Sequence, residues 1–241
     1  MFYDFHVHSC LSPCADDDMT PFDIAGMARI CGLDAIALTD HNSCLNLPAF
    51  FHACEYYEII PIAGMELATS EEIHLICLFL DLASALEFSD FVESRLMKIK
   101  NKPNVFGHQY IYSPDETEKN ECTLLLSAAS SISLTEAFEK VTSYGGICYP
   151  AHIDRPSFSL TSVLGSFPDK PQFSYFELSN PENQNSIAIK HNSILKMKRL
   201  FGSDSHTLSN IGENMGFFNL ADDFNEVYNS NILIKHLHKF S

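Results

Sequence analysis

Short apolar runs alternate along this chain with longer amphipathic segments, and this alternation constrains the fold more than any other feature. The runs occupy residues 35–38, 59–63, 73–79 and 147–149, and polar residues or glycine bound them. Runs of this length without polar alternation are typical of strands that are buried on both faces, as in parallel sheets. We therefore expect a sheet of parallel strands.

The segments between the runs carry the signals of helices. One helix is predicted over residues 21–31 after Thr20, a second over 82–99, and a third over 133–144, where Ser133 and Glu136 have the spacing of a capping box. Strands that alternate with helices indicate an α/β fold. A (β/α) barrel is favoured, because polar residues follow several of the strands, at the face where barrel proteins form their sites.

The chain has 241 residues, which is enough for one barrel, and no strong linker divides it. We predict a single domain over residues 1–241. Residues 100–123 interrupt the alternation with Pro103, Gly107 and a charged stretch, which indicates an inserted loop or hairpin that could cover the site.

The formal net charge is -16, from 31 acidic and 15 basic side chains. Such a field repels polyanions, so we expect no long nucleic acid as a partner, whereas a small phosphorylated substrate could bind where metal ions reverse the local field. The N-terminus has no signal-peptide pattern and no apolar run reaches membrane-spanning length, which predicts a cytoplasmic protein without a membrane partner. The eight cysteines lie scattered in apparent core segments and are expected to be reduced.

Residues able to bind metal stand at the ends of the apolar runs. His6 and His8 flank Val7, and alternation along a strand directs both imidazoles to the same side. Imidazole is a ligand for Zn, Fe, Mn or Ni, although two histidines on one strand can equally be hydrogen-bonded structural residues. The further candidates are Asp40, His41, Glu66, His74, His152, Asp204 and His206.

Each of these candidates alone could be part of a polar turn, a surface acid or a buried histidine. Six separate strand ends deliver such residues, however, and chance would place many of them on helix faces. A carboxylate such as Glu66 can also bridge two cations with its two oxygens. The remaining histidines fall in helix-like polar stretches or in the insertion, and we assign them to the solvated surface: His52, His108, His191, His236 and His238.

Six motifs stand in order along the chain: His6-Val7-His8-Ser9, Thr39-Asp40-His41-Asn42, Gly64-Met65-Glu66, His74, Ala151-His152 and Ser203-Asp204-Ser205-His206. Together they resemble the PHP (polymerase and histidinol phosphatase) family, and the resemblance spans nearly the whole chain. It implies a distorted seven-stranded (β/α) barrel of TIM-like type. It also implies two or three divalent metal ions, with Zn, Mn or Fe preferred over Mg.

The resemblance assigns ligands to these metals. A first metal would be held by His6, His8, Glu66 and Asp204, and a second by Glu66, His74 and His152. Glu66 would bridge the two. A third metal would use His41, His206 and one further ligand from the segment after the histidine pair, which is longer here than in the common form. We choose Asp16 for that position, with Asp17 second.

The resemblance implies a metal-dependent phosphoesterase that hydrolyses a phosphomonoester or a short nucleotide with a metal-activated hydroxide. Glu66 and Asp204 would be essential, and Arg155 could orient a phosphate oxygen or instead pair with Asp154 or another acid. Asp40, a site histidine or a metal-bound water could protonate the leaving group. Two alternatives stay open. One is amidohydrolase-like hydrolysis of a non-phosphate bond, with Glu66 where a bridging lysine is usual, and the other is a non-catalytic metal-binding regulatory module.

Overall fold

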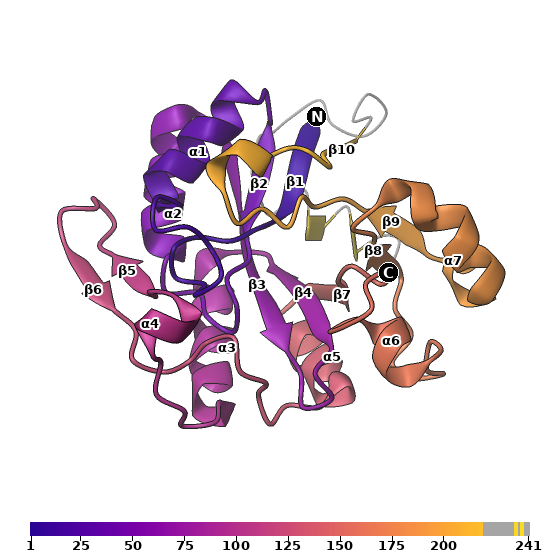
Figure 1. The fold of residues 1–241 in the computed structure, drawn as a ribbon. Coiled ribbons are helices and arrows are strands. Elements are labelled where there is room, and N and C mark those ends of the chain that lie inside the picture. Colours follow the sequence, from indigo (N-terminus) through magenta and orange to yellow (C-terminus); the bar gives the residue numbers. More distant parts are fainter. Residues whose placement is uncertain (219–233, 236, 239–241) are drawn as a thin grey trace.

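The computed structural model describes residues 1–218, 234–235 and 237–238 (Figure 1). Outside the segment 100–123, its strands are β1 (Phe2–Val7), β2 (Ala35–Leu38), β3 (Ile60–Ala68), β4 (His74–Phe79), β7 (Ile147–Pro150), β8 (Tyr175–Glu177), β9 (Lys198–Leu200) and β10 (Gly216–Phe217). Six of them form one sheet in the order β10-β1-β2-β3-β4-β7, and β8 pairs with β9. Figure 1 shows that the sheet curls around a common centre.

Backbone hydrogen bonds connect the two sheets into a ring. The amide of Ile153, just after β7, donates to the carbonyl of Glu177 in β8 at 2.9 Å. On the other side, the amide of Phe5 in β1 donates to the carbonyl of Phe201, next to β9, at 3.1 Å. Among the described residues, seven strands therefore surround the centre: β1, β2, β3, β4, β7, β8 and β9. This is the distorted seven-stranded α/β barrel that the resemblance implies.

The strands are not all parallel, which corrects one expectation. β1, β2 and β3 run parallel, but β4 is antiparallel to both β3 and β7. The connection from β3 to β4 consists of residues 69–73 only, whereas a parallel crossover needs a dozen or more residues. A hydrophobic run indicates that a strand is buried on both faces, but it does not indicate the direction of the strand. The expectation that all strands are parallel was therefore wrong for β4.

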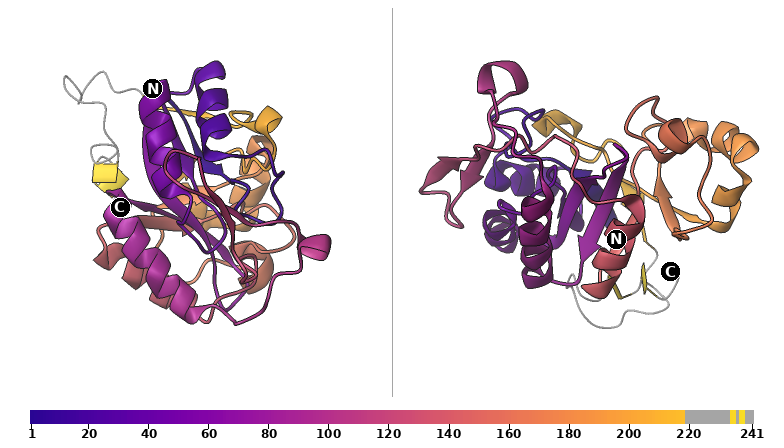
Figure 2. Two further views of the ribbon diagram at one scale, coloured as in Figure 1. Left: turned by 90° about the vertical axis from the view of Figure 1, so that its left-hand side faces the viewer. Right: turned by 90° about the horizontal axis from the view of Figure 1, so that it is seen from below.

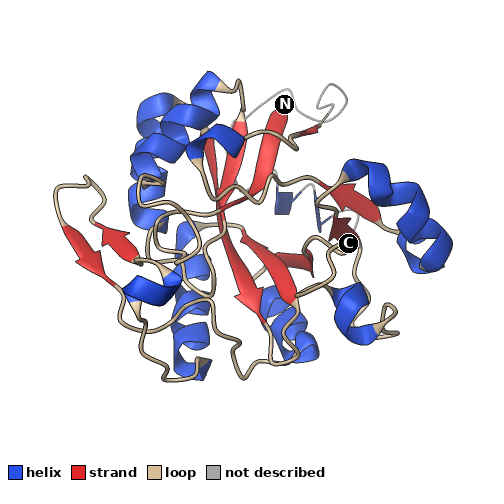
Figure 3. Ribbon diagram, in the orientation of Figure 1, coloured by secondary structure: helices blue, strands red, loops and turns tan. Residues whose placement is uncertain are grey.

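The main helices lie outside the strands (Figures 2 and 3). They are α1 (Pro21–Ile30), α2 (Leu47–Tyr57), α3 (Leu82–Arg95) and α5 (Leu134–Ser143), with shorter α6 (Leu160–Leu164) and α7 (Gln184–Lys190). Thr20 and Ser133 cap α1 and α5, because each hydroxyl accepts from a backbone amide three residues on, at 3.2 Å. The helix predicted over 82–99 ends early, where Leu96 turns extended and pairs with Ser130.

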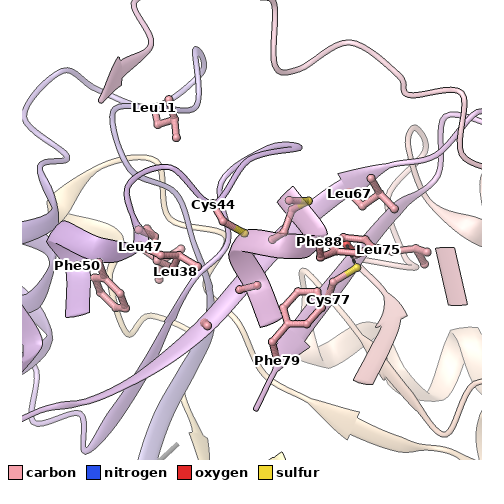
Figure 4. Packing of buried hydrophobic residues seen from close by; sticks show 14 of the residues in the cluster. Leu11, Leu38, Cys44, Leu47, Phe50, Leu67, Leu75, Cys77, Phe79 and Phe88 are labelled. Carbon is pink, nitrogen blue, oxygen red and sulfur yellow. Dashed lines mark hydrogen bonds between the residues drawn. The ribbon is translucent and has the colours of Figure 1, made fainter. Parts of the chain in front are cut away.

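Two hydrophobic clusters fill the two sides of the strands. The outer cluster packs strand residues such as Leu38 and Phe79 against helix residues such as Phe50 and Phe88 (Figure 4). The inner cluster fills part of the barrel interior and includes Phe5. Burial on both faces explains why the strands are apolar throughout, and it leaves the strand ends as the place for polar chemistry.

The segment 100–123 forms a small unit beside the barrel. It contains α4 (Pro103–Phe106) and a two-stranded hairpin of β5 (Tyr110–Tyr112) and β6 (Lys119–Glu121). The amide of Tyr110 donates to the carbonyl of Cys10 at 2.8 Å, and the amide of Phe22 donates to Oε1 of Glu116 at 2.6 Å. The hairpin is thus attached both to the loop after β1 and to the start of α1.

Candidate metal centre

The ends of the barrel strands gather the predicted ligands in one place. His6 lies near the end of β1 and His74 begins β4, while His152 and Asp204 follow β7 and β9. Glu66 lies within β3 and not after it, because β3 continues to Ala68 in its pairing with β4. His152 and Asp204 both have a positive φ, of 29° and 54°. Such conformations cost roughly 1–3 kcal/mol each and are concentrated at functional sites.

The first group of side chains that could hold a metal consists of His6, His8, Glu66 and Asp204. The Nε2 atoms of His6 and His8 lie 3.1 Å apart, and each lies 3.1 Å from Oδ1 of Asp204. The Glu66 oxygens lie 3.4 Å from His6 Nε2 and 3.2 Å from His8 Nε2. Ligands of a tetrahedral zinc ion with bonds of about 2.05 Å stand about 3.3 Å apart. The four side chains therefore have the spacing of one coordination shell.

Glu66 also belongs to a second group, because its two oxygens face different imidazoles. Oε1 lies 2.9 Å from Nδ1 of His74 and 3.1 Å from Nε2 of His152. Oε2 lies 3.2 Å from Nε2 of His8 and 3.0 Å from Nδ1 of His41. His41, Glu66 and His74 together form a second group that could hold a metal. The carboxylate thus stands where one acid can serve two cations.

A third group contains His8, His41 and His206. Ring centroids lie 4.4 Å apart for His8 and His206 and 4.6 Å apart for His8 and His41. His41 and His206 are the residues predicted for a third metal. His8 stands between this group and the first one, so the three groups are continuous.

The further ligand predicted for the third metal, Asp16, is exposed, as is Asp17. Only the backbone of Asp16 contacts this region, where its amide donates to the carbonyl of His206 at 2.9 Å. Its carboxylate belongs to none of the three groups found among the described residues. The side chain beside His206 is that of Cys14, whose Sγ lies 3.1 Å from Nε2.

Three buried polar atoms on the predicted ligands have no hydrogen-bond partner. They are Oδ1 of Asp204, Nδ1 of His41 and Nδ1 of His152. Leaving a buried polar atom without a partner costs about 1–3 kcal/mol. Converging carboxylate oxygens and imidazole nitrogens are the donor set of Zn, Fe or Mn, so these residues fit the divalent metals that the resemblance implies.

Hydrogen bonds behind the imidazoles fix their orientation. With its proton on Nδ1, His6 donates to the Glu177 carboxylate at 3.0 Å, and His8 likewise donates to Oγ of Ser12 at 2.9 Å. The Ser12 hydroxyl in turn donates to Oδ1 of Asp40 at 2.7 Å. When the two rings are neutral, as metal binding requires, both Nε2 lone pairs face the centre, which is how carboxylates and hydroxyls behind metal-binding histidines act.

Sequence reasoning missed Glu177 and Ser12. Glu177 ends the short strand β8, so the rule that located the other strand-end acids would have found it. Ser12 lies in the loop after His8 and has no such signal. Asp40 is buried and accepts from the amide and hydroxyl of Ser9 and from Ser12, at 2.6 to 2.7 Å.

The ionisable groups of the centre shift one another's pKa values. Burial lowers the pKa of His8, but contacts with Asp204 and Glu66 outweigh it and raise the pKa to about 9. Burial raises the pKa of Glu66, but the surrounding imidazoles, His74 first, hold it well below its usual range. Burial and the neighbouring His8 lower the pKa of His206 to about 4. Without metal, the centre therefore holds Glu66 ionised, His8 protonated and His206 neutral at pH 7.

Arg155 lies at the open edge of the centre. Its Nη1 is 2.6 Å from Oδ2 of Asp204, and its Nε donates to Oγ of Ser179 at 2.7 Å. The side chain of Arg155 is 42% exposed, against 5% for Asp204. Asp154 does not pair with it and instead accepts from the amides of Ser179 and Asn180, at 2.7 and 3.0 Å. The acid that Arg155 contacts is thus a predicted metal ligand.

The histidines assigned to the surface lie outside the three groups. His52 is exposed, and His108, His191 and His238 are half-buried. His236 lies outside the described residues. All eight cysteines have free thiols, as predicted. Within the described residues, no helix has the length and hydrophobicity to cross a bilayer.

The profile of the PHP domain family matches residues 4–156 of the chain. This covers more than half of its length, so the chain belongs to the PHP domain family, whose members are metal-dependent hydrolases. No curated protein matches the chain by sequence.

Several solved structures are similar to the chain. A candidate metal-dependent phosphoesterase from Bifidobacterium adolescentis is 17% identical, with a TM-score of 0.60 over 85% of this chain and 87% of that one. Endonuclease Q, solved with a 27-mer duplex that carries an abasic lesion, is 17% identical with a TM-score of 0.57. The match covers 86% of this chain but 49% of Endonuclease Q, so the chain spans about half its length.

An amidohydrolase from Chromobacterium violaceum, solved with bound sulfate and no metal, is 16% identical with a TM-score of 0.55, over 88% of this chain and 90% of that one. Identities this low establish a shared fold alone. The PHP-type barrel is therefore confirmed, and the substrate is not.

Proposed function

We propose that this chain is a phosphoesterase that uses two or three divalent metal ions to hydrolyse a small phosphorylated substrate. The observation that carries this proposal is the position of Glu66, whose two oxygens face separate sets of imidazoles. A carboxylate between two cations is a common arrangement in enzymes that cleave phosphate esters. Such a pair can act on both the attacking and the leaving oxygen.

We assign the first metal to His6, His8, Glu66 and Asp204, and the second to Glu66, His74 and His152. His41 and His206 belong to a third site. These donor sets are rich in imidazole, which favours Zn, Fe or Mn over Mg. Metals bound there would supply an activated water and stabilise negative charge on phosphate oxygens.

Arg155 is the residue that we assign to the phosphate itself. Its Nε and one Nη are fixed by Ser179 and Asp204, so the guanidinium plane has a defined orientation at the rim of the centre. The remaining N–H donors of this planar group suit a non-bridging phosphate oxygen. Arg155 would therefore hold a non-bridging phosphate oxygen of the ester at the rim of the centre.

Asp40 is a poor candidate to protonate the leaving group, although the sequence allowed it. It is 2% exposed, and its oxygens already accept from Ser9 and Ser12. We assign Asp40 to holding the loop that carries Ser12. Protonation of the leaving group is assigned to a site histidine or a water.

We propose a phosphomonoester or a short nucleotide as the substrate. The net charge of -16 opposes the approach of a long polyanion. The similarity to Endonuclease Q, which is described with duplex DNA at its active site, favours a nucleotide among small phosphoesters. A DNA duplex itself would need a basic surface to offset this charge.

Hydrolysis of a non-phosphate bond is the alternative that one observation favours, namely the similarity in fold to an amidohydrolase. Glu66 occupies the bridging position where that chemistry usually has a lysine. A non-catalytic regulatory module would bind the same metals and turn over neither class of substrate.

The test is turnover by the purified protein loaded separately with Mn, Zn, Fe or Mg. Phosphomonoesters, short nucleotides, duplex DNA and simple amides and lactones are compared in one panel. We expect hydrolysis of small phosphoesters only, abolished by a chelator and restored by metal. Amide or lactone turnover alone would support the alternative, and a metal-loaded protein inactive on the whole panel would refute the proposal.

Two substitutions connect this activity to the centre. Glu66→Ala and Asp204→Asn should abolish turnover, because each removes a shared or central metal ligand. Glu87→Ala and Asp169→Asn are matched controls, since both side chains are exposed and outside the three groups. Activity retained in Glu66→Ala or Asp204→Asn would exclude the assigned ligand.

A further inference from the structure

Cys14 lies beside His206 of the third group, although like Asp16 it is exposed and outside the three groups. Its Sγ lies 3.1 Å from Nε2 of His206, and its side chain also contacts His41. A metal with a bond of about 2.3 Å to sulfur and about 2.05 Å to nitrogen separates these atoms by about 3.1 to 3.6 Å, for bond angles between 90° and 109°. The observed separation lies at the short end of this range.

The orientation of His206 favours coordination. Its Nδ1 donates to the carbonyl of Asp204 at 2.8 Å, so the lone pair of Nε2 points at the sulfur. A thiol could also donate a weak hydrogen bond to this nitrogen, and the contact with His206 alone does not distinguish the two roles.

A second observation favours coordination. His41 is 7% exposed, and its Nδ1 has no hydrogen-bond partner although Oε2 of Glu66 lies 3.0 Å away. One nitrogen each of His8, His41 and His206 lies within 4.8 Å of the others. A cation held between these imidazoles would accept the lone pair of Nδ1 of His41, whereas a thiol hydrogen bond to His206 leaves that atom without a partner.

The loop after β1 is held so that Cys14 reaches the centre and Asp16 does not. The amide of Asp16 donates to the carbonyl of His206 at 2.9 Å, and the amide of Cys10 donates to the carbonyl of Met19 at 2.8 Å. The segment 100–123 packs against the same loop. A Cβ on Gly107 would lie 2.0 Å from the carbonyl oxygen of Pro13, so only glycine permits this approach.

We propose that Cys14 binds the third metal as a thiolate, together with His41 and His206. This inference rests on the proposed metal centre and adds the identity of a ligand. On binding, the S–H bond breaks, the sulfur lone pair forms the bond to the metal, and the proton leaves to solvent. Thiolate selects Zn, Fe or Co over Mg, Ca or Mn, so the third site takes softer ions than an Asp ligand would favour.

Cobalt(II) is the probe, because a thiolate bonded to it gives a near-ultraviolet charge-transfer band that imidazole and carboxylate ligands do not. Metal-free protein is titrated with Co(II) while the spectrum and the bound metal per chain are recorded. We expect the band to grow with one equivalent of bound cobalt. Cys14→Ser should lose the band and about one bound metal per chain while the visible cobalt bands of the other sites remain.

Two variants serve as controls. Cys31→Ser also removes one thiol, but Cys31 donates to the carbonyl of Ile211 away from the centre, so the band should persist. Asp16→Asn should keep the band and the metal count. A band that survives in Cys14→Ser, or a third metal lost in Asp16→Asn, would overturn the inference.

The inference can fail separately from the proposed function. If wild-type protein binds cobalt at the first two sites and shows no charge-transfer band, the thiolate ligand is excluded while the phosphoesterase proposal stands. If it binds no cobalt at all, both are excluded.

Discussion

Glu177 lies directly behind His6, with its two carboxylate oxygens 3.0 and 3.1 Å from Nδ1 of the imidazole. Both side chains are almost wholly buried, and the same carboxylate accepts from the amide of His152 at 3.1 Å. A carboxylate in this position orients the ring, fixes the proton on Nδ1 and makes Nε2 a better donor to a metal. Glu177 is therefore a positioning residue for two of the proposed ligands.

Glu177→Gln should weaken binding of the first metal by about 10- to 100-fold, the usual effect of removing such a carboxylate. Glutamine has nearly the same shape, so the barrel should stay folded and the loss should fall on the metal. Metal affinity is measured by competition with a chelator, and folding by circular dichroism. Glu182→Gln, at an exposed position, is the control. Unchanged affinity in Glu177→Gln would mean that His6 needs no orienting acid.

Most of the proposed ligands could be found from sequence because they stand at or just after strand ends, and strand ends converge in a barrel. The assignment of His6, Glu66 and Asp204 to one metal came from the family resemblance, and Glu66 lies within β3 instead of at its end. Strand direction was not accessible. A buried antiparallel strand such as β4 has the same apolar composition as a parallel one, and only the short connection 69–73 distinguishes them.

The further ligand of the third site could not be located from strand ends. Asp16 was chosen by residue type, because an acid is a familiar ligand after a histidine pair. Which side chain of that loop reaches His206 depends on tertiary contacts, among them the close approach of Gly107 to Pro13. These contacts come from the inserted hairpin, which no local pattern near Cys14 could reveal.

Arg155→Lys should lower kcat/KM on the identified phosphoester by about 10- to 100-fold. The substitution keeps the positive charge but removes the planar guanidinium and with it a hydrogen bond to the phosphate. A hydrogen bond to a charged group contributes about 1.5–3 kcal/mol. Metal content should not change, because Arg155 belongs to none of the three groups. Arg29→Lys, on the exposed side of α1, is the control. Loss of metal from Arg155→Lys would instead indicate that the arginine acts only by holding Asp204.

The inserted hairpin should stabilise the barrel through Glu116. This carboxylate accepts from the amide of Phe22 in the first turn of α1, one of the amides that a helix leaves without an internal partner. Glu116→Gln is expected to lower the free energy of unfolding by about 1 kcal/mol, and Tm by about 2–4 °C for a chain of this size. Glu118→Gln, on the same hairpin but exposed, should leave Tm unchanged. Equal melting of both variants would remove Glu116 from this role.

Metal binding should become tighter as pH rises. In the metal-free protein, burial lowers the pKa values of His8 and His41, but nearby carboxylates and, for His41, Cys14 outweigh it and raise each to about 9. Both are therefore protonated at pH 7, and a metal must displace these protons. Affinity should rise by about tenfold per pH unit for each displaced proton and level off above about pH 9.

The stability of the metal-free protein should change in the opposite direction over the same range. A histidine whose pKa is raised on folding stabilises the fold fully below its unfolded value of 6.5, and this contribution is lost as pH rises to about 9. His206 acts in the opposite direction near pH 6, because its folded pKa is lowered to about 4 while the unfolded imidazole still binds a proton below about 6.5, and this effect ends by about pH 7.5. Thermal melting from pH 7.5 to 9.5, with and without zinc, therefore measures both effects. As pH rises, the Tm of the metal-free protein should fall, and the increase in Tm produced by zinc should grow. If Tm changes with pH in the same way with and without zinc, the protonation states derived for His8 and His41 are contradicted.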